Sequence, residues 1–213
     1  HLSANYYRVS DIDYFKDIAQ TNTDVTSLSS NLTLTYKDYG YSATLFTENV
    51  QVVNAGTPGY TRALEGSVSK TFNADKKIPI QVDLISTKFA HDTVSKESGV
   101  RTHTNLGISR SLNVKYPLIT PNASVAITNY SLNNSPNINR TILGSGVSID
   151  FTFERKGDLF GSKINHRISP IISYNYRAKK VQGNIPIFDT TDKYDDIITF
   201  ADLTSGERYT GFD

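Results

Sequence analysis

The sequence predicts an all-β protein: an antiparallel, up-and-down segment of about nine strands from a larger transmembrane β-barrel. Three observations carry this prediction. Apolar and polar side chains alternate with a period of two, the alternating segments are about ten residues long, and short connections alternate with longer ones. A tilted strand needs about 9–11 residues to cross a bilayer. Outer-membrane barrels join such strands by short turns on one side and longer loops on the other.

The alternation is clearest in the segment Gly146–Glu154. One face there is apolar: Val147, Ile149, Phe151 and Phe153. The other is polar: Ser148, Asp150, Thr152 and Glu154. The same period runs through eight further segments, which are Ser3–Ser10, Leu28–Lys37, Tyr41–Val52, Arg62–Phe72, the stretch around Ile80–Ile85, Arg101–Lys115, the stretch around Ala123–Thr128, and Ile164–Arg177. Period-two alternation indicates strands with one face buried or in lipid.

The connections divide into two classes. Short ones are predicted at Asp38–Gly40, Asn73–Lys77, around Pro117–Thr120 and at Lys156–Lys163. Longer ones are predicted at Asp11–Ser27, Val53–Tyr60, Asp92–Gly99, Asn133–Ile138 and Lys179–Asp213. We therefore expect one domain, with strands across residues 1–178 and a long extracellular loop at 179–213.

The two faces differ in kind. A soluble two-layer sandwich shows the same alternation, but tyrosines gather at strand ends, as in an interfacial belt. The strands also exceed the five or six residues common in globular proteins. On the barrel interpretation the apolar face meets lipid: Leu32, Leu34, Val82, Leu84, Val125, Ile127, Val147, Ile149, Phe151 and Ile172. The polar face lines the lumen, and the candidate lumen-facing residues are Gln81, Asp83, Asp150, Glu154, Arg167, Asn175 and Arg177.

Composition and motifs argue against an enzyme, a metal or cofactor site, and a nucleic-acid partner. The formal net charge is +1 and cysteine is absent. The four histidines, His1, His91, His103 and His166, are scattered without metal-ligand spacing. Ser148 lies in an alternating strand rather than a nucleophile elbow. No run of 18 apolar residues exists to form a transmembrane helix. The chain starts inside an expected strand, which indicates a piece of a longer precursor.

Several motifs occur in a familiar order. They are Val9-Ser10-Asp11 before Tyr14-Phe15-Lys16-Asp17, then Phe153-Glu154-Arg155, Ile168-Ser169-Pro170 before Tyr174-Asn175-Tyr176-Arg177, Asn184–Thr190, and Arg208–Asp213. In this order they resemble the family of the LPS-assembly protein LptD across essentially the whole chain. At the end of the chain Phe212 stands where that family has Leu.

The resemblance implies a role in moving lipopolysaccharide (LPS) to the outer leaflet of a Gram-negative outer membrane. It implies a barrel of about 26 strands, of which this chain supplies an internal arc without the lateral gate. The implied partners are LPS, outer-membrane lipids, the plug lipoprotein LptE, and the periplasmic Lpt bridge through an N-terminal domain outside this sequence. The resemblance also suggests that the 179–213 loop contacts the plug, with Tyr194, Phe200 and Tyr209 as contact candidates.

Two alternatives remain open from the residues alone. One is a soluble or surface-exposed β-sandwich adhesin. The other is a segment of a porin-like or TonB-dependent barrel. An adhesin predicts a monodisperse protein in buffer without detergent, whereas a barrel segment predicts aggregation.

Overall fold

The structure is a computed structural model, and it is all-β in the residues that it describes, which confirms the predicted fold class. These residues are 1–11, 13, 14, 25–53, 58–74, 78–93, 95–112, 117–159, 162–178, 185–189 and 192. Among them, no helix has the length and hydropathy needed to cross a membrane.

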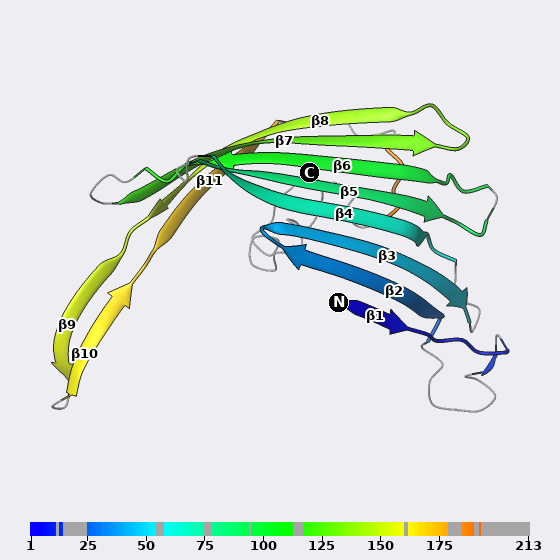
Figure 1. The fold of residues 1–213 in the computed structure, drawn as a ribbon, viewed down its shortest axis with the longest axis horizontal. Helices are drawn as coiled ribbons and strands as arrows, with labels where there is room; N and C mark the ends of the chain where they lie inside the picture. The colour runs from blue at the N-terminus through cyan, green and yellow to red at the C-terminus, as the bar shows by residue number, and fades with distance from the viewer. Residues whose placement is uncertain are drawn as a thin grey trace.

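Nine strands form one open antiparallel sheet, in which nearly every strand lies beside its neighbour in sequence (Figure 1). The order is β1-β2-β3-β4-β5-β6-β7-β8-β11, and β9 and β10 form a separate two-stranded hairpin. The bounds are β1 Leu2–Asn5, β2 Ser27–Asp38, β3 Tyr41–Val52, β4 Thr61–Ala74, β5 Ile78–Ala90, β6 Gly99–Ser109, β7 Leu118–Leu132, β8 Ile138–Asp150, β9 Phe153–Leu159, β10 Ser162–Ile168 and β11 Ile171–Arg177.

The two ends of the sheet differ in their connections. At one end, here called the turn end, residues 39–40 join β2 to β3 and residues 75–77 join β4 to β5. Tyr39 and Gly40 have φ angles of 42° and 76°, and positive φ at both central residues suits a tight hairpin. The opposite end, here called the loop end, carries the connections 53–60, 91–98 and 133–137.

Some predicted boundaries are wrong. The predicted strand Ser3–Ser10 ends at Asn5, and Arg101–Lys115 ends at Ser109. Leu118–Thr120 belong to β7, so the connection at the turn end there is residues 110–117 and is not short. At the turn end, two of the three connections are therefore short, and the third, residues 110–117, is not.

The register places the predicted apolar residues on one face of the sheet. Leu34 pairs with Leu45, Leu84 with Val68, and Ile172 with Ile149. Directly paired residues lie on the same side of a sheet. This side, here called the apolar face, includes Leu32, Leu34, Val82, Leu84, Val125, Ile127, Val147, Ile149 and Ile172. The opposite side, here called the covered face, carries Arg101 and Tyr130, and residues 185–189 lie against it.

The apolar band crosses the strands obliquely. Counted from the loop end, the first exposed large hydrophobic side chain on the apolar face is Leu32 in β2 and Leu143 in β8. Leu143 shares a row of paired residues with Val125, Leu106, Val82, Lys70, Tyr41 and Asp38. Leu32 and Asp38 are six residues apart on one strand, so the band shifts by six residues over six strand spacings. At about 3.3 Å per residue and about 4.8 Å per spacing, this corresponds to a strand tilt of about 35°, close to that of outer-membrane barrels.

The chain reverses within the predicted short connection Lys156–Lys163, but the connection is shorter than predicted, because β9 runs to Leu159 and β10 begins at Ser162. Gly157 pairs with Ile164 and Asp158 with Lys163, so these residues lie inside the β9–β10 hairpin. Its strands extend β8 and β11 beyond the turn end, and Figure 1 shows the hairpin bending away from the main sheet. Lys-Gly-Asp resembles a turn by composition, but the ladder continues through it.

Candidate functional site

Five of the seven candidate lumen residues lie on the covered face. Gln81 and Asp83 are neighbours on that side of β5, and Asp150 ends β8. Asn175 and Arg177, on β11, pair with Gly146 and Gly144 of β8. The other two candidates, Glu154 and Arg167, lie instead on the β9–β10 hairpin, where they pair with each other at 3.7 Å between Oε1 and Nε. The seven are therefore not one site.

A polar hollow lies on the covered face below the loop end. Its volume is about 380 Å³, and Asp83, His103, Asn105 and Arg177 are among its lining residues. The Asp83 carboxylate accepts hydrogen bonds from Ser69 Oγ at 2.7 Å and from Gln81 Nε2 at 3.0 Å. These bonds fix the carboxylate in place, so the hollow is a preformed polar surface that carries both signs of charge.

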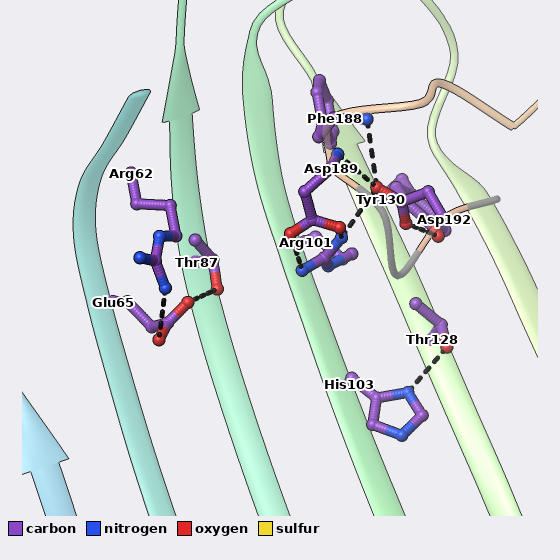
Figure 2. A network of polar contacts seen from close by, with 10 residues as sticks. All are labelled: Arg62, Glu65, Thr87, Arg101, His103, Thr128, Tyr130, Phe188, Asp189 and Asp192. Carbon is purple, nitrogen blue, oxygen red and sulfur yellow. Dashed lines mark hydrogen bonds and ion pairs between the residues drawn. The ribbon is translucent and has the colours of Figure 1, made fainter. Parts of the chain in front are cut away.

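A buried ion-pair cluster lies at the loop end of the same face, and Figure 2 shows it closely. The Arg101 guanidinium donates to both carboxylate oxygens of Asp189 at 2.9 Å, and to Asp192 Oδ2 at 2.7 Å. The Arg101 side chain is 3% exposed and that of Asp192 is 0% exposed. Such a bidentate arginine–carboxylate contact is among the strongest polar interactions in proteins.

Asp192 is held from several sides. Tyr130 Oη donates to its Oδ1 at 2.7 Å. The backbone N–H of Phe188 donates to its Oδ2 at 3.0 Å. Each carboxylate oxygen therefore has a partner from the sheet, which offsets the cost of removing the charge from water. The cluster, here called the tail clamp, consists of Arg101, Tyr130, Phe188, Asp189 and Asp192.

Aromatic packing seals the tail clamp. The Phe188 ring stacks on Phe89 with centroids 4.7 Å apart, and it meets Tyr60 edge-to-face at 5.1 Å. Arg101 lies over the Phe89 ring at 4.8 Å from its centroid. Phe89, Tyr130 and Phe188 form the buried hydrophobic cluster of the covered face. Residues 185–189 and 192, here called the tail segment, are thus fixed by both apolar burial and charge.

Polar pairs continue across the covered face. His103 Nδ1 lies 2.8 Å from Thr128 Oγ1 on the next strand. Thr87 donates to Glu65 at 2.9 Å, and the Glu65 carboxylate lies 3.6 Å from Arg62 (Figure 2). Within the described ranges, no group of three or more His, Cys, Asp or Glu side chains is placed to hold a metal ion.

The loops beside the tail clamp are tied together by Glu97. Its carboxylate accepts from Ser135 Oγ at 2.6 Å and from the N–H of Asn134 at 2.9 Å. These hydrogen bonds lower the pKa of Glu97 below its ordinary value. Burial, reinforced by the charge of Glu97, raises the pKa of Tyr60. The connections before β4, β6 and β8 thus meet at the loop end. These three connections are here called the rim.

The tail contacts predicted from the sequence, Tyr194, Phe200 and Tyr209, lie outside the described residues. The described residues of this segment that contact the sheet come earlier, and they include Phe188, Asp189 and Asp192. One signal could have found them. Arg101 is a cation in an alternating strand, and a cation on a buried sheet face requires an anionic partner.

The whole chain, residues 1–213, matches the family model described as LptD: LPS transport system D. A protein of Nitrosospira multiformis named LPS-assembly protein LptD is 25% identical over 98% of this chain and 24% of its own length. Proteins with the same name from Azoarcus sp. and Pseudomonas savastanoi are 24% and 23% identical over 96% and 98% of this chain. The chain spans about a quarter of the length of these relatives. With a match over its full length, this chain belongs to the LPS transport system D family.

Proposed function

We propose that this chain forms an arc of the wall of an outer-membrane LPS translocon and holds a loop segment over the lumen. The chain belongs to a family of outer-membrane proteins of Gram-negative bacteria, whose role is transport and assembly rather than enzymatic catalysis. This assignment replaces the alternatives of an adhesin or of another porin-like barrel.

The observation that carries the proposal is a tilted sheet with two unlike faces. The apolar face exposes Leu32, Leu34 and Leu84, as a lipid-facing wall requires. The covered face presents Asp83, His103 and Arg177 at the polar hollow. We propose that acyl chains contact the apolar face in the outer membrane and that the sugars and phosphates of LPS pass along the covered face.

The sheet of described strands has two open edges. The described sheet ends at β1 and β11, and a bilayer tolerates strands only where every backbone group is paired. We propose that preceding and following segments of a longer chain pair with these edges and close the barrel. The 179–213 segment is proposed as an extracellular loop, anchored to the wall through the tail clamp.

The proposal is tested by photo-crosslinking in cells that carry the full-length protein. A benzophenone amino acid at Asn105, on the covered face, is expected to capture newly made LPS, and the adduct is expected to vanish when LPS synthesis stops. The same amino acid at Leu34, on the apolar face, is expected to capture membrane lipid under both conditions. Absence of LPS adducts at Asn105 while LPS reaches the surface would contradict a role of this face in transport.

The plug lipoprotein LptE and the periplasmic Lpt bridge are proposed partners of the whole protein. For the plug, the same crosslinker is placed at Tyr194, Phe200 and Tyr209. Capture of the lipoprotein at one or more of these positions supports loop–plug contact. Failure at all three, in cells where Leu34 still captures lipid, would reject that contact and leave the wall role intact.

A further inference from the structure

The β9–β10 hairpin is the part of the described chain that the proposed wall does not need. It forms a sheet of its own and continues beyond the turn end, where Asp150 pairs with Ile171 (Figure 1). In outer-membrane barrels the end with short turns is the periplasmic one. The hairpin therefore reaches the periplasmic boundary of the membrane.

The hairpin has two unlike faces. Phe153 pairs with Ile168, and Gly157 pairs with Ile164, on one face. Phe153 is 56% exposed and Ile168 is 67% exposed. The other face is charged and polar along its whole length: Glu154, Lys156, Asp158, Lys163, Asn165 and Arg167. Exposed apolar side chains collected on one side of a strand pair indicate a surface that is covered in use.

The apolar side of the hairpin continues the apolar face of the main sheet. Alternation along the strand places Phe153 on the side of Ile149, and Ile168 on the side of Ile172. The rings of Phe151 and Phe153 lie parallel across the junction, with centroids 6.4 Å apart. The apolar band also moves toward the turn end from β2 to β8, so it reaches the hairpin.

The guanidinium of Arg155 and the imidazole of His166 interrupt the apolar residues of this face, between the Phe153–Ile168 pair and the Gly157–Ile164 pair. Arg155 and His166 are paired on this same face, one step beyond Phe153 and Ile168. Lys156, Lys163 and Arg167 add positive charge, against Glu154 and Asp158. Cations at the edge of an apolar band extend toward lipid phosphates, since the aliphatic stem stays in the apolar layer and the charge reaches the headgroups.

We propose that the β9–β10 hairpin docks on the periplasmic leaflet of the outer membrane. Phe153 and Ile168 lie in the acyl chains, and Arg155 and His166, one pair further from the main sheet, contact the phosphates of phospholipid headgroups. This inference rests on the proposed function, because the apolar face must face lipid for the hairpin to continue into it. The occupant is a lipid surface rather than a periplasmic protein, because the hairpin is continuous with that lipid-facing wall.

Photo-crosslinking of the full-length protein in phosphatidylethanolamine and phosphatidylglycerol vesicles tests the inference. A benzophenone amino acid is placed at Phe153, Ile168, Asn165 or Leu34. Lipid adducts at Phe153, Ile168 and Leu34, with none at Asn165, are the expected result. If Leu34 captures lipid while Phe153 and Ile168 capture protein or nothing, the docking is overturned and the wall is left intact. Lipid at Asn165 as well would overturn the one-sided contact.

The position at Leu34 separates the two proposals. If Leu34 captures no lipid in a folded protein, the wall itself is wrong, and the hairpin inference fails with it. A charge test then addresses the headgroups. R155E is expected to lower the phosphatidylglycerol share of the adducts at Phe153 by about fivefold, as one cation near an anionic surface implies. K156E, on the opposite face, is the matched control and is expected to change it less than twofold. Equal effects of the two variants would reject the phosphate contact.

Discussion

A single arginine organises the covered face at the scale of residues. Arg101 is buried, and its charge is balanced by Asp189 and Asp192, which follow 88 and 91 residues later in the chain. Replacing a buried ion pair by apolar groups is often neutral, but removing one partner leaves an uncompensated charge. Arg101 is therefore the residue whose loss most directly frees the tail segment.

R101A is expected to undock the tail. Two carboxylates lose their cation, one of them fully buried, and removing one partner from a buried pair costs about 3–5 kcal/mol. Hydrogen exchange of residues 185–189 in the full-length protein is expected to accelerate strongly. R110A, which removes an exposed arginine just beyond β6, is the control and is expected to leave exchange unchanged. Unaltered protection in R101A would show that aromatic packing alone holds the tail.

Protonation of Glu97 is expected to loosen the rim. Its pKa lies below the ordinary value of 4.5 because Ser135 and Asn134 donate to the carboxylate. The hydrogen bonds from Asn134 and Ser135 to the ionised Glu97 carboxylate therefore contribute fully when the pH is above 4.5. Their contribution is lost as the pH falls through the lowered pKa of Glu97. Exchange at the Asn134 amide, corrected for its intrinsic pH dependence, measures this. E97Q is expected to show fast exchange at every pH, while E154Q retains the wild-type profile.

The sequence predicted which residues share a face better than it predicted which residues meet. Alternation alone identifies Asp83 and Arg177 as covered-face residues, because the period of a strand is fixed. The tail clamp depends on where residues 185–192 return to the sheet, and no local pattern determines that position. The same limit explains why aromatic residues further along the tail were preferred over Asp189 and Asp192.

At the scale of elements, the oblique apolar band matters most. The apolar band is displaced toward the turn end between β2 and β8, so the strands must be tilted for the band to lie flat in a membrane. The sequence carries this information, but only the register reveals it, since the shift is measured between paired residues. The sequence underestimates the length of the β9–β10 hairpin for a related reason: composition indicates where a turn is favourable, whereas pairing determines where a strand ends.

L34R is expected to destabilise the folded barrel, because arginine on a lipid face costs about 1 kcal/mol near an interface and about 2–4 kcal/mol at the bilayer midplane. T35R is the matched control, because the adjacent residue points to the covered face and the substitution there is expected to cost less than about 1 kcal/mol. Unfolding of the full-length protein from phospholipid vesicles by guanidinium measures both. Equal costs would contradict the assignment of the faces.

G99A is expected to disturb the pairing of β6 with β7. A Cβ at Gly99 would collide with the backbone carbonyl oxygen of Ser131 and would approach Leu132 Cα to 3.1 Å. Backbone atoms cannot move aside cheaply, so a cost of about 1–3 kcal/mol follows. G66A is the control, since a Cβ there meets nothing within 4 Å. A thermal shift for G99A that does not exceed that of G66A would reject this packing argument.

The molecule as a whole is an open arc. Within the part of the chain that the structure describes, unpaired edges at β1 and β11 flank a sheet with an exposed apolar face, and both features promote association between chains. Expressed alone in buffer, residues 1–213 are expected to aggregate, and size-exclusion chromatography with light scattering would measure this. Detergent is expected to cover the apolar face, but it cannot pair with the backbone groups at the strand edges. A monodisperse monomer in buffer would contradict the barrel arc.

The tail clamp also constrains the order of assembly. Most strand pairs of the sheet join neighbours in the chain, so the ladder can grow stepwise as each hairpin closes. Asp189 and Asp192 instead reach back across several completed strands to Arg101. Their docking is therefore a late step, and until it occurs the guanidinium remains open to water. A barrel stalled during insertion would differ from a finished one by an Arg101 guanidinium that reacts with phenylglyoxal, a kinetic signature of the closing step.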